Sequence, residues 1–229
     1  YAHLQVRDEI ARIQGIGIAA PLSLGGWHEV LGIAPEKAAK WLPVDIRRRV
    51  AAMTDLPVGF VKDTAAACVA ELVAGRGRSM RSFLYIFVDT FIGGGLVLDS
   101  HLRGGLHGNA GAVGSMPLGL AQGDSPAARG QLLAVASLFN LEASYRAQGL
   151  DPGAAADDRA LQPPWLAPTE RWLADAAPAI ALTINAAACL LDLEGVIIDG
   201  SFGPALRQRL LAALDPALAR HSWEGVERP

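Results

Sequence analysis

The stretch of residues 83–115 constrains the fold of this chain more than any other. It opens with a short apolar run, residues 83–88, whose aromatic and β-branched side chains predict a strand buried on both faces. A polar turn and three glycines follow, and residues 96–98 then predict a second strand. Glycine allows a backbone to approach a ligand closely, so two strands joined by a glycine-rich turn can present bare N–H groups to it. The five glycines between residues 104 and 114 predict a shaped loop.

The composition is that of a globular chain without a basic surface. Of its 229 residues, 51% are hydrophobic and 19% are charged, and the formal net charge is −3. A DNA-binding surface needs a concentration of positive charge that this composition does not supply. No apolar run approaches the roughly 20 residues of a membrane span. Cys68 and Cys189 give no zinc signature and are expected to be small buried residues in a reducing compartment, so we expect a cytoplasmic protein without membrane contact.

The layout of the central stretch resembles that of the ROK family (repressor, open reading frame, kinase). In that family a strand, the turn GTGIGGG, a second strand and a loop ending in AGEIGH follow one another. The matching segments here are DTFIGGG at residues 89–95 and AGAVGS at residues 110–115. The resemblance covers roughly residues 15–214. It implies an α/β fold of the actin-like, sugar-kinase (ribonuclease H-like) type, with two lobes around a central cleft.

We expect the two lobes to comprise residues 1–80 and 81–229, joined by a basic segment at residues 75–82. The phosphate-binding hairpin that opens the family's N-terminal lobe has no match before Gly15, and the closing helix has no match after Ser222. Both lobes are therefore expected to be partial in this sequence. In regulators of the family a helix-turn-helix domain precedes that hairpin, so contact with DNA would require residues outside this sequence.

The remaining segments carry simpler signals. Residues 16–20 and 56–61 predict strands, and residues 64–74 predict a helix. Residues 132–148 predict one amphipathic helix, and 151–168 a loop packed around Trp165. Residues 170–193 predict one or two Ala-rich helices divided or started near Pro178, residues 195–198 a buried strand, and residues 204–214 a final helix.

Asp63 is the candidate catalytic residue. It follows a predicted strand and precedes a predicted helix, where a carboxylate can accept a hydrogen bond from a ligand hydroxyl or cap the helix. The resemblance to the family pattern PVxVxNDANAAALAE places Asp63 where the family's aspartate takes the proton from the attacking sugar hydroxyl. The family's asparagine is Lys62 here. A neighbouring cation would lower the pKa of Asp63 and weaken it as a base, so we treat it as a vestigial base position.

The resemblance also implies a sugar site in which most positions have changed chemistry. The glutamate and histidine of AGEIGH are Ala112 and Ser115 here, and the glutamate of GCLEAYAS is Leu133. Residues 116–137 contain no cysteine, so no cysteine-based zinc site is expected. Each buried hydroxyl left unpaired costs about 1–3 kcal/mol, which would remove most of the specificity for a sugar. The ligand-binding positions implied are Lys62, Asp63, Asn109, Ala112, Ser115 and Leu133.

The phosphate-binding positions have changed in a similar way. The outer glycines of the family's GTG are Asp89 and Phe91 here. A carboxylate at this position would repel phosphate, and the Phe91 side chain would obstruct close backbone approach. The family's glycine pair beside the nucleotide is Asp199-Gly200 here. The implied phosphate loop comprises Asp89, Thr90, Gly93, Gly94 and Gly95, and the nucleotide-side turn comprises Asp199 and Gly200.

These changes lead us to expect a non-catalytic protein. It would be the effector-sensing and oligomerisation domain of a ROK-type transcriptional regulator, a homodimer without a cofactor, whose effector is a small molecule such as a sugar or sugar derivative. Three alternatives stay open. The first alternative is a working ATP- and Mg²⁺-dependent kinase for a hexose or N-acetylhexosamine, supported by Asp63 and Gly93–Gly95. The second alternative is a module that binds a non-sugar metabolite in an apolar pocket at Ala112 and Leu133. The third alternative is a structural dimerisation domain without a ligand.

Overall fold

The computed structural model describes residues 13–22, 28, 32–119 and 130–229. Its contacts divide the chain into two compact units, Tyr1–Ala66 and Ala67–Pro229. The predicted lobe boundary after residue 80 lies further along the chain than this division after Ala66. The basic segment that was expected to join the lobes forms a short 3-10 helix, η2 (Arg76–Ser79), whose Gly77 is buried. It therefore belongs to the packed part of the second unit, whereas the division into functional lobes stays a prediction.

The first unit is built on a parallel pair of strands, β1 (Ile16–Ala20) and β2 (Val58–Lys62). Both strands lie where the sequence predicts them. The chain passes from β2 directly into the helix α4 (Asp63–Ala74), so the predicted succession of strand, aspartate and helix is confirmed. Among the described residues between these strands, two segments form short helices, α2 (Pro35–Ala39) and α3 (Ile46–Ala51).

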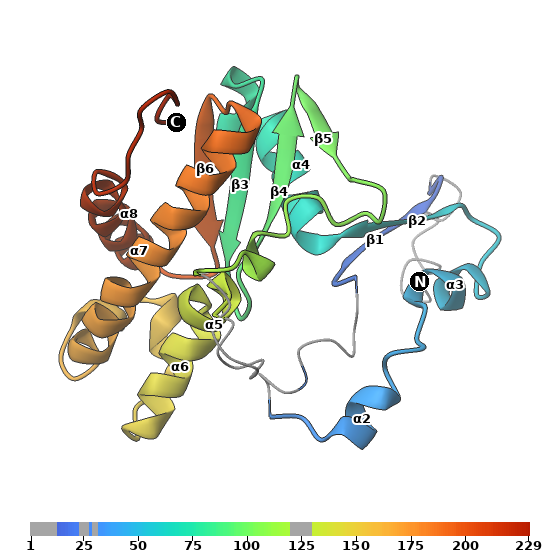
Figure 1. Ribbon diagram of the computed structural model, residues 1–229. Coiled ribbons are helices and arrows are strands. Elements are labelled where there is room, and N and C mark those ends of the chain that lie inside the picture. The colour runs from blue at the N-terminus through green and yellow to red at the C-terminus, as the bar shows by residue number, and fades with distance from the viewer. Residues whose placement is uncertain (1–12, 23–27, 29–31, 120–129) are drawn as a thin grey trace. The chain divides into compact units, whose positions relative to one another are not determined.

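The second unit contains a four-stranded sheet in the order β5-β4-β3-β6 (Figure 1). Its central strand β3 pairs antiparallel with β4 and parallel with β6. All residues of β3 except Phe87 are buried, which confirms the predicted strand with two covered faces. The strands are β3 (Phe83–Val88), β4 (Gly93–Leu98), β5 (His101–Arg103) and β6 (Gly195–Gly200).

The three consecutive glycines lie inside β4 and not in the turn before it, which corrects the sequence prediction. Gly94 is paired with Ile86 of β3. A Cβ atom on Gly94 would lie 2.4 Å from the carbonyl oxygen of Tyr85 and 3.0 Å from that of Gly111. The glycine is therefore required by close packing between strand and loop. Glycine has a low strand propensity, so the sequence alone favoured a turn.

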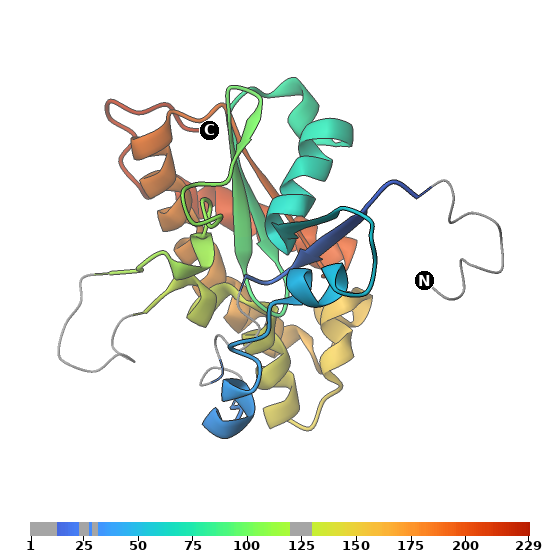
Figure 2. The same ribbon diagram turned by 90° about the vertical axis from the view of Figure 1, so that its right-hand side faces the viewer.

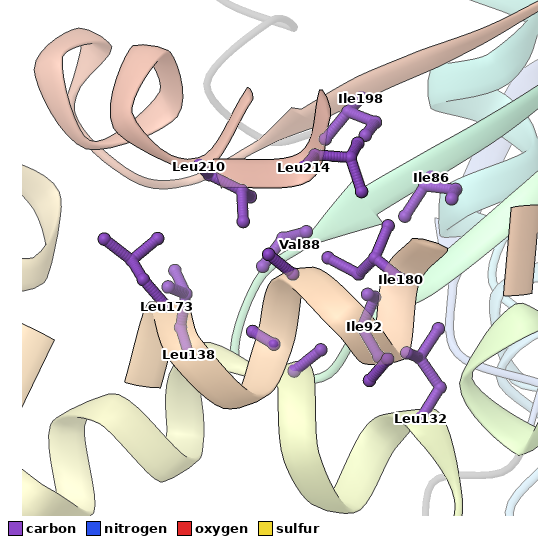
Figure 3. Packing of buried hydrophobic residues seen from close by; sticks show 14 of the residues in the cluster. Ile86, Val88, Ile92, Leu132, Leu138, Leu173, Ile180, Ile198, Leu210 and Leu214 are labelled. Atoms are coloured by element: carbon purple, nitrogen blue, oxygen red, sulfur yellow. The ribbon is translucent and has the colours of Figure 1, made fainter. Parts of the chain in front are cut away.

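Helices cover both faces of this sheet. Cys68 of α4 is buried against one face, among Phe83, Tyr85 and other side chains, and α7 and α8 lie on the opposite side, as Figure 2 shows. Figure 3 shows Ile86 of the sheet near Ile180 of α7 and the helix α8 above them. The second cysteine, Cys189, is exposed, so only one of the two is buried as expected. The two helices are α7 (Leu166–Leu191) and α8 (Pro204–Leu218).

The segment 132–148 forms two helices instead of the single one predicted. They are α5 (Leu132–Ala136) and α6 (Leu138–Ala147). The residue between them, Ser137, has extended backbone angles, with φ −71° and ψ 148°. Its hydroxyl donates to the carbonyl of Leu133 at 2.7 Å. The same hydroxyl accepts a hydrogen bond from the N–H of Ile92 at 3.1 Å, a contact with a residue far away in the sequence.

The helix α7 runs without interruption through Pro178, so the predicted segment is one helix. By length and composition it is apolar enough to cross a membrane, but 56% of its apolar window is buried inside the protein. That burial is typical of the core helix of a folded domain. The preceding loop is packed by its own tryptophan, as predicted, because the indole N–H of Trp165 donates to the carbonyl of Asp151 at 3.0 Å. The guanidinium of Arg159 lies 5.5 Å from the centre of the Trp165 ring.

Candidate functional site

The carboxyl ends of the parallel strands β3 and β6 meet at one edge of the sheet in the second unit. Val88 is opposite Gly200, and the N–H of Ser201 donates to the carbonyl of Val88 at 3.1 Å. The turn of residues 89–92, which contains Asp89 and Thr90 of the predicted phosphate loop, therefore lies beside the predicted nucleotide-side turn at Asp199 and Gly200. Gly93, Gly94 and Gly95 of the predicted loop lie in β4. Ligands of open α/β sheets bind outside the carboxyl ends of the strands.

Two carboxylates lie at this edge, and each has a local partner. The Asp89 carboxylate accepts a hydrogen bond from the N–H of Thr90 at 2.7 Å. The Asp199 carboxylate lies 3.6 Å from the guanidinium of Arg207, and the two side chains are 32% and 38% exposed. Arg207 of α8 thus offsets part of the negative charge that was expected to repel phosphate. One signal in the sequence could have identified this residue, namely its place in the first turn of the helix that follows the strand.

A buried phenol lies in the middle of β3, three residues before its carboxyl end. Tyr85 is 1% exposed on the α4 face of β3. Burial, and after it the negative charge of Asp199, raises the pKa of Tyr85. The ring of Phe91, expected to block the turn, is half-buried and packs against Phe139 of α6, with the ring centres 6.3 Å apart.

The glycine loop after β5 packs closely on the turn and on α5. Gly111 has φ +74°, and a Cβ atom there would lie 2.8 Å from the Cα of Gly95. A Cβ atom on Gly114 would lie 2.3 Å from the carbonyl oxygen of Ile92 and 3.6 Å from the Cβ of Leu133. The structure therefore brings together three motifs that lie far apart in the sequence, namely the turn, the loop ending in AGAVGS and the start of α5.

The predicted ligand positions in this unit differ in their accessibility. Leu133 is 4% exposed and belongs to the apolar core, so its side chain packs inside the protein and offers no contact to a ligand in solution. Ala112 is half-buried, whereas Asn109 and Ser115 are exposed. A separate groove of about 710 Å³ opens between α5, α6 and α7, lined among others by Asn140. None of the predicted site residues lines it.

Asp63 is the first residue of α4 and is exposed at the carboxyl end of β2. Its carboxylate accepts a hydrogen bond from the N–H of Thr64 at 2.7 Å, which satisfies one of the free N–H groups at the helix start. The capping interpretation is therefore compatible with the geometry, and the role toward a ligand stays a prediction. Lys62, the last residue of β2, is half-buried.

A metal site is not evident in the part of the chain that the structure describes. No group of three or more His, Cys, Asp or Glu side chains is placed there to hold a metal ion. Residues 120–129, within the segment where the family carries its cysteines, lie outside the described residues. The expectation of no zinc therefore rests on the absence of cysteine from that part of the sequence.

Two curated relatives share moderate sequence identity with the chain. The bifunctional enzyme NanE/NanK of Brucella melitensis is 32% identical over 201 residues, which are 85% of this chain and 36% of that protein. The N-acetylmannosamine kinase of Haemophilus influenzae is 36% identical over 69 residues, which are 30% of this chain and 23% of that protein. The chain spans about a third or less of the length of these relatives.

Solved structures of the same family superpose on most of the chain. A ROK hexokinase from Thermus thermophilus matches with a TM-score of 0.65 and 29% identity, over 94% of this chain and 70% of that one. A ROK transcriptional regulator, a homologue of the E. coli MLC protein, matches with a TM-score of 0.66 and 21% identity, over 96% of this chain and 59% of that one. These likenesses confirm the predicted α/β fold of the actin-like, sugar-kinase type.

The comparisons overturn the prediction that this chain is not an enzyme. The two relatives described above are named as an enzyme and a kinase, and a solved hexokinase is 29% identical to the chain. The prediction was wrong because changes of glycine and of charge at single positions do not by themselves show that a whole site is lost. The model of the ROK family matches residues 3–226. The chain belongs to the ROK family.

Proposed function

We propose that this chain is the kinase part of a ROK sugar kinase that phosphorylates N-acetylmannosamine or a related N-acetylhexosamine with ATP. The proposal is supported by the 32% identity to the NanE/NanK enzyme over 85% of the chain. The structural observation that carries it is Asp63, an exposed carboxylate at the junction of β2 and α4. A carboxylate at a strand end is able to accept the proton of an acceptor hydroxyl.

In this proposal Asp63 takes the proton from the sugar hydroxyl, the hydroxyl oxygen attacks the γ-phosphorus of ATP, and ADP leaves. Phosphoryl transfer depends mainly on positioning and on electrostatic stabilisation, and little covalent chemistry falls to the protein. The turn of residues 89–92 would orient the phosphates, and the Asp199–Gly200 turn would contact the nucleotide. Arg207 would keep the charge of Asp199 from repelling the phosphates.

Mg²⁺ would be the companion of ATP in this proposal. Mg²⁺ is held in such sites by one or two carboxylates together with substrate phosphates, and Asp89 and Asp199 supply groups of that kind. When bound, the cation would neutralise phosphate charge. A cytoplasmic location and a homodimer are part of this proposal, and a DNA contact is not. The hexokinase among the solved structures, which is 29% identical, supports a sugar as the small molecule in this proposal.

The test is an assay of ADP release with N-acetylmannosamine, N-acetylglucosamine and glucose, on full-length protein. We expect turnover with an N-acetylhexosamine, and we expect Asp63→Asn to lower kcat by at least about 100-fold, because the amide cannot accept the proton. Asp175→Asn, at an exposed position of α7, is the matched control and should keep wild-type turnover. Failure of all three sugars to release ADP would refute the proposal.

A further inference from the structure

The β3–β4 turn is held by the junction between α5 and α6. The N–H of Leu138 donates to the carbonyl of Asp89 at 2.9 Å, and the N–H of Phe139 donates to the carbonyl of Thr90 at 3.3 Å. The first N–H groups of a helix have no partner within the helix. Here two of those at the start of α6 bind the turn instead, so the start of the helix fixes the turn backbone.

Ser137 adds a side-chain bond to this connection. Its hydroxyl oxygen accepts a hydrogen bond from the N–H of Ile92 at 3.1 Å and donates its proton to the carbonyl of Leu133 at 2.7 Å. Its own carbonyl accepts a bond from the indole N–H of Trp172 at 3.2 Å. One residue therefore joins the turn to α5 and to α7.

The surroundings of Ser137 make this bond hard to replace. Ser137 is 1% exposed and Ile92 is 2% exposed. Figure 3 shows the side chains of Ile92 and Leu132 beside Ile180 of α7, in the apolar cluster to which all three belong. Water has little access to such a place, so removal of the hydroxyl leaves a buried N–H without its acceptor.

We infer that Ser137 is a positioning residue, which holds the β3–β4 turn in the shape that meets the nucleotide phosphates and couples that turn to α5. The role toward phosphate rests on the proposed kinase function. The mechanical coupling rests only on the hydrogen bonds and burial described above. Ser137 would contact neither the substrate nor the reacting atoms, because it acts through the backbone of Ile92.

A matched control is available in the same core. Thr183 of α7 is fully buried, and its hydroxyl donates to the carbonyl of Ala179, four residues earlier, at 3.0 Å. Ser137 makes the corresponding bond to Leu133. Ser137→Ala and Thr183→Val each remove one buried hydroxyl at nearly constant volume. Only Ser137→Ala removes the hydrogen-bond acceptor of the Ile92 N–H in the turn.

The first measurement is amide hydrogen exchange by mass spectrometry on the full-length protein without ligand. We expect residues 89–95 to exchange about 10-fold faster in Ser137→Ala, which is the size of effect a lost buried hydrogen bond produces, and to stay within about twofold of wild type in Thr183→Val. Ser137→Cys, whose sulfur is a weak acceptor, should fall in between. Equal acceleration in the Ala and control variants, or acceleration spread evenly over the chain, would overturn the coupling.

The second measurement is the affinity for Mg²⁺ with a non-hydrolysable ATP analogue, by calorimetry at low temperature. We expect Ser137→Ala to bind it about 10-fold more weakly, because the turn must be reordered on binding, and Thr183→Val to bind it as wild type does. An unchanged affinity in Ser137→Ala would overturn the positioning role. If the wild-type protein binds no nucleotide, the proposed kinase function fails, and hydrogen exchange alone still decides the coupling.

Discussion

Replacing Gly94 by alanine tests the packing that joins the glycine loop to the central sheet. The added Cβ atom would lie 2.4 Å from the carbonyl oxygen of Tyr85, 3.0 Å from that of Gly111 and 3.0 Å from a methyl carbon of Val113. Two of these three atoms belong to the backbone. Neither can rotate away as a side chain does, so either β3 or the loop has to move.

The loss of folding stability in Gly94→Ala follows from how far the contacted backbone atoms must move. Insertion of a methyl group into a well-packed site costs typically about 1–3 kcal/mol, and the short contact with the Tyr85 carbonyl places Gly94→Ala at the upper end. For a protein of this size a loss of about 3 kcal/mol lowers Tm by roughly 6–12 °C. The displaced loop is also the one that carries Ala112 and Ser115, so binding of a sugar should weaken in parallel.

The assay is thermal unfolding followed by circular dichroism, with Gly104→Ala as control. Gly104 lies in the exposed part of the same loop, and a Cβ atom there would meet nothing within 4 Å. We expect the Tm of the control to stay at the wild-type value or rise slightly, because alanine reduces the entropy of the unfolded chain. If Gly94→Ala unfolds at the same temperature as Gly104→Ala, the packing argument is wrong.

Two further predictions concern charged groups. The hydrogen bonds donated by Arg159 lower the pKa of Asp157. This pair therefore stabilises the fold fully above the ordinary aspartate pKa near 4, and the stabilisation is lost as the pH falls through the lowered pKa. The Tm difference between wild type and Arg159→Met should be largest near pH 6 and should shrink toward pH 3. Arg207→Met removes the partner of Asp199, and we expect it to weaken Mg²⁺–ATP binding measurably while the Tm stays near wild type, since the pair is partly exposed. A constant Tm difference across pH would contradict the first prediction, and an unchanged ATP affinity the second.

The regular elements were predictable because their hydrophobic patterns are strong and local. The run at residues 83–88 is apolar at every position, and a run of this kind within so short a length is typical of a strand covered on both faces. The start of α8 was similarly marked by Pro204, which suits the first turn of a helix. These signals depend on neighbouring residues alone.

Features that depend on distant contacts were not predictable in this way. The break at Ser137 arises because its hydroxyl binds the N–H of Ile92, a residue 45 positions away in the sequence. No local pattern distinguishes that serine from one on an ordinary helix surface. Leu133 was assigned to a ligand site on family resemblance, although the burial of its side chain is decided by the loop that covers it.

The packing role of the glycines changes what their presence says about function. Gly94 in β4 packs against the loop, and Gly111 in the loop packs against β4. A side chain at either position would collide with backbone atoms. The fold requires them whether or not a phosphate binds, so the glycine pattern identifies the fold and gives little evidence on activity. Asp63 is different, because it is exposed and serine, threonine or asparagine would cap α4 as well. A carboxylate there is not required by packing, so the proposed phosphoryl transfer is better tested at Asp63, where replacement by asparagine separates catalysis from capping.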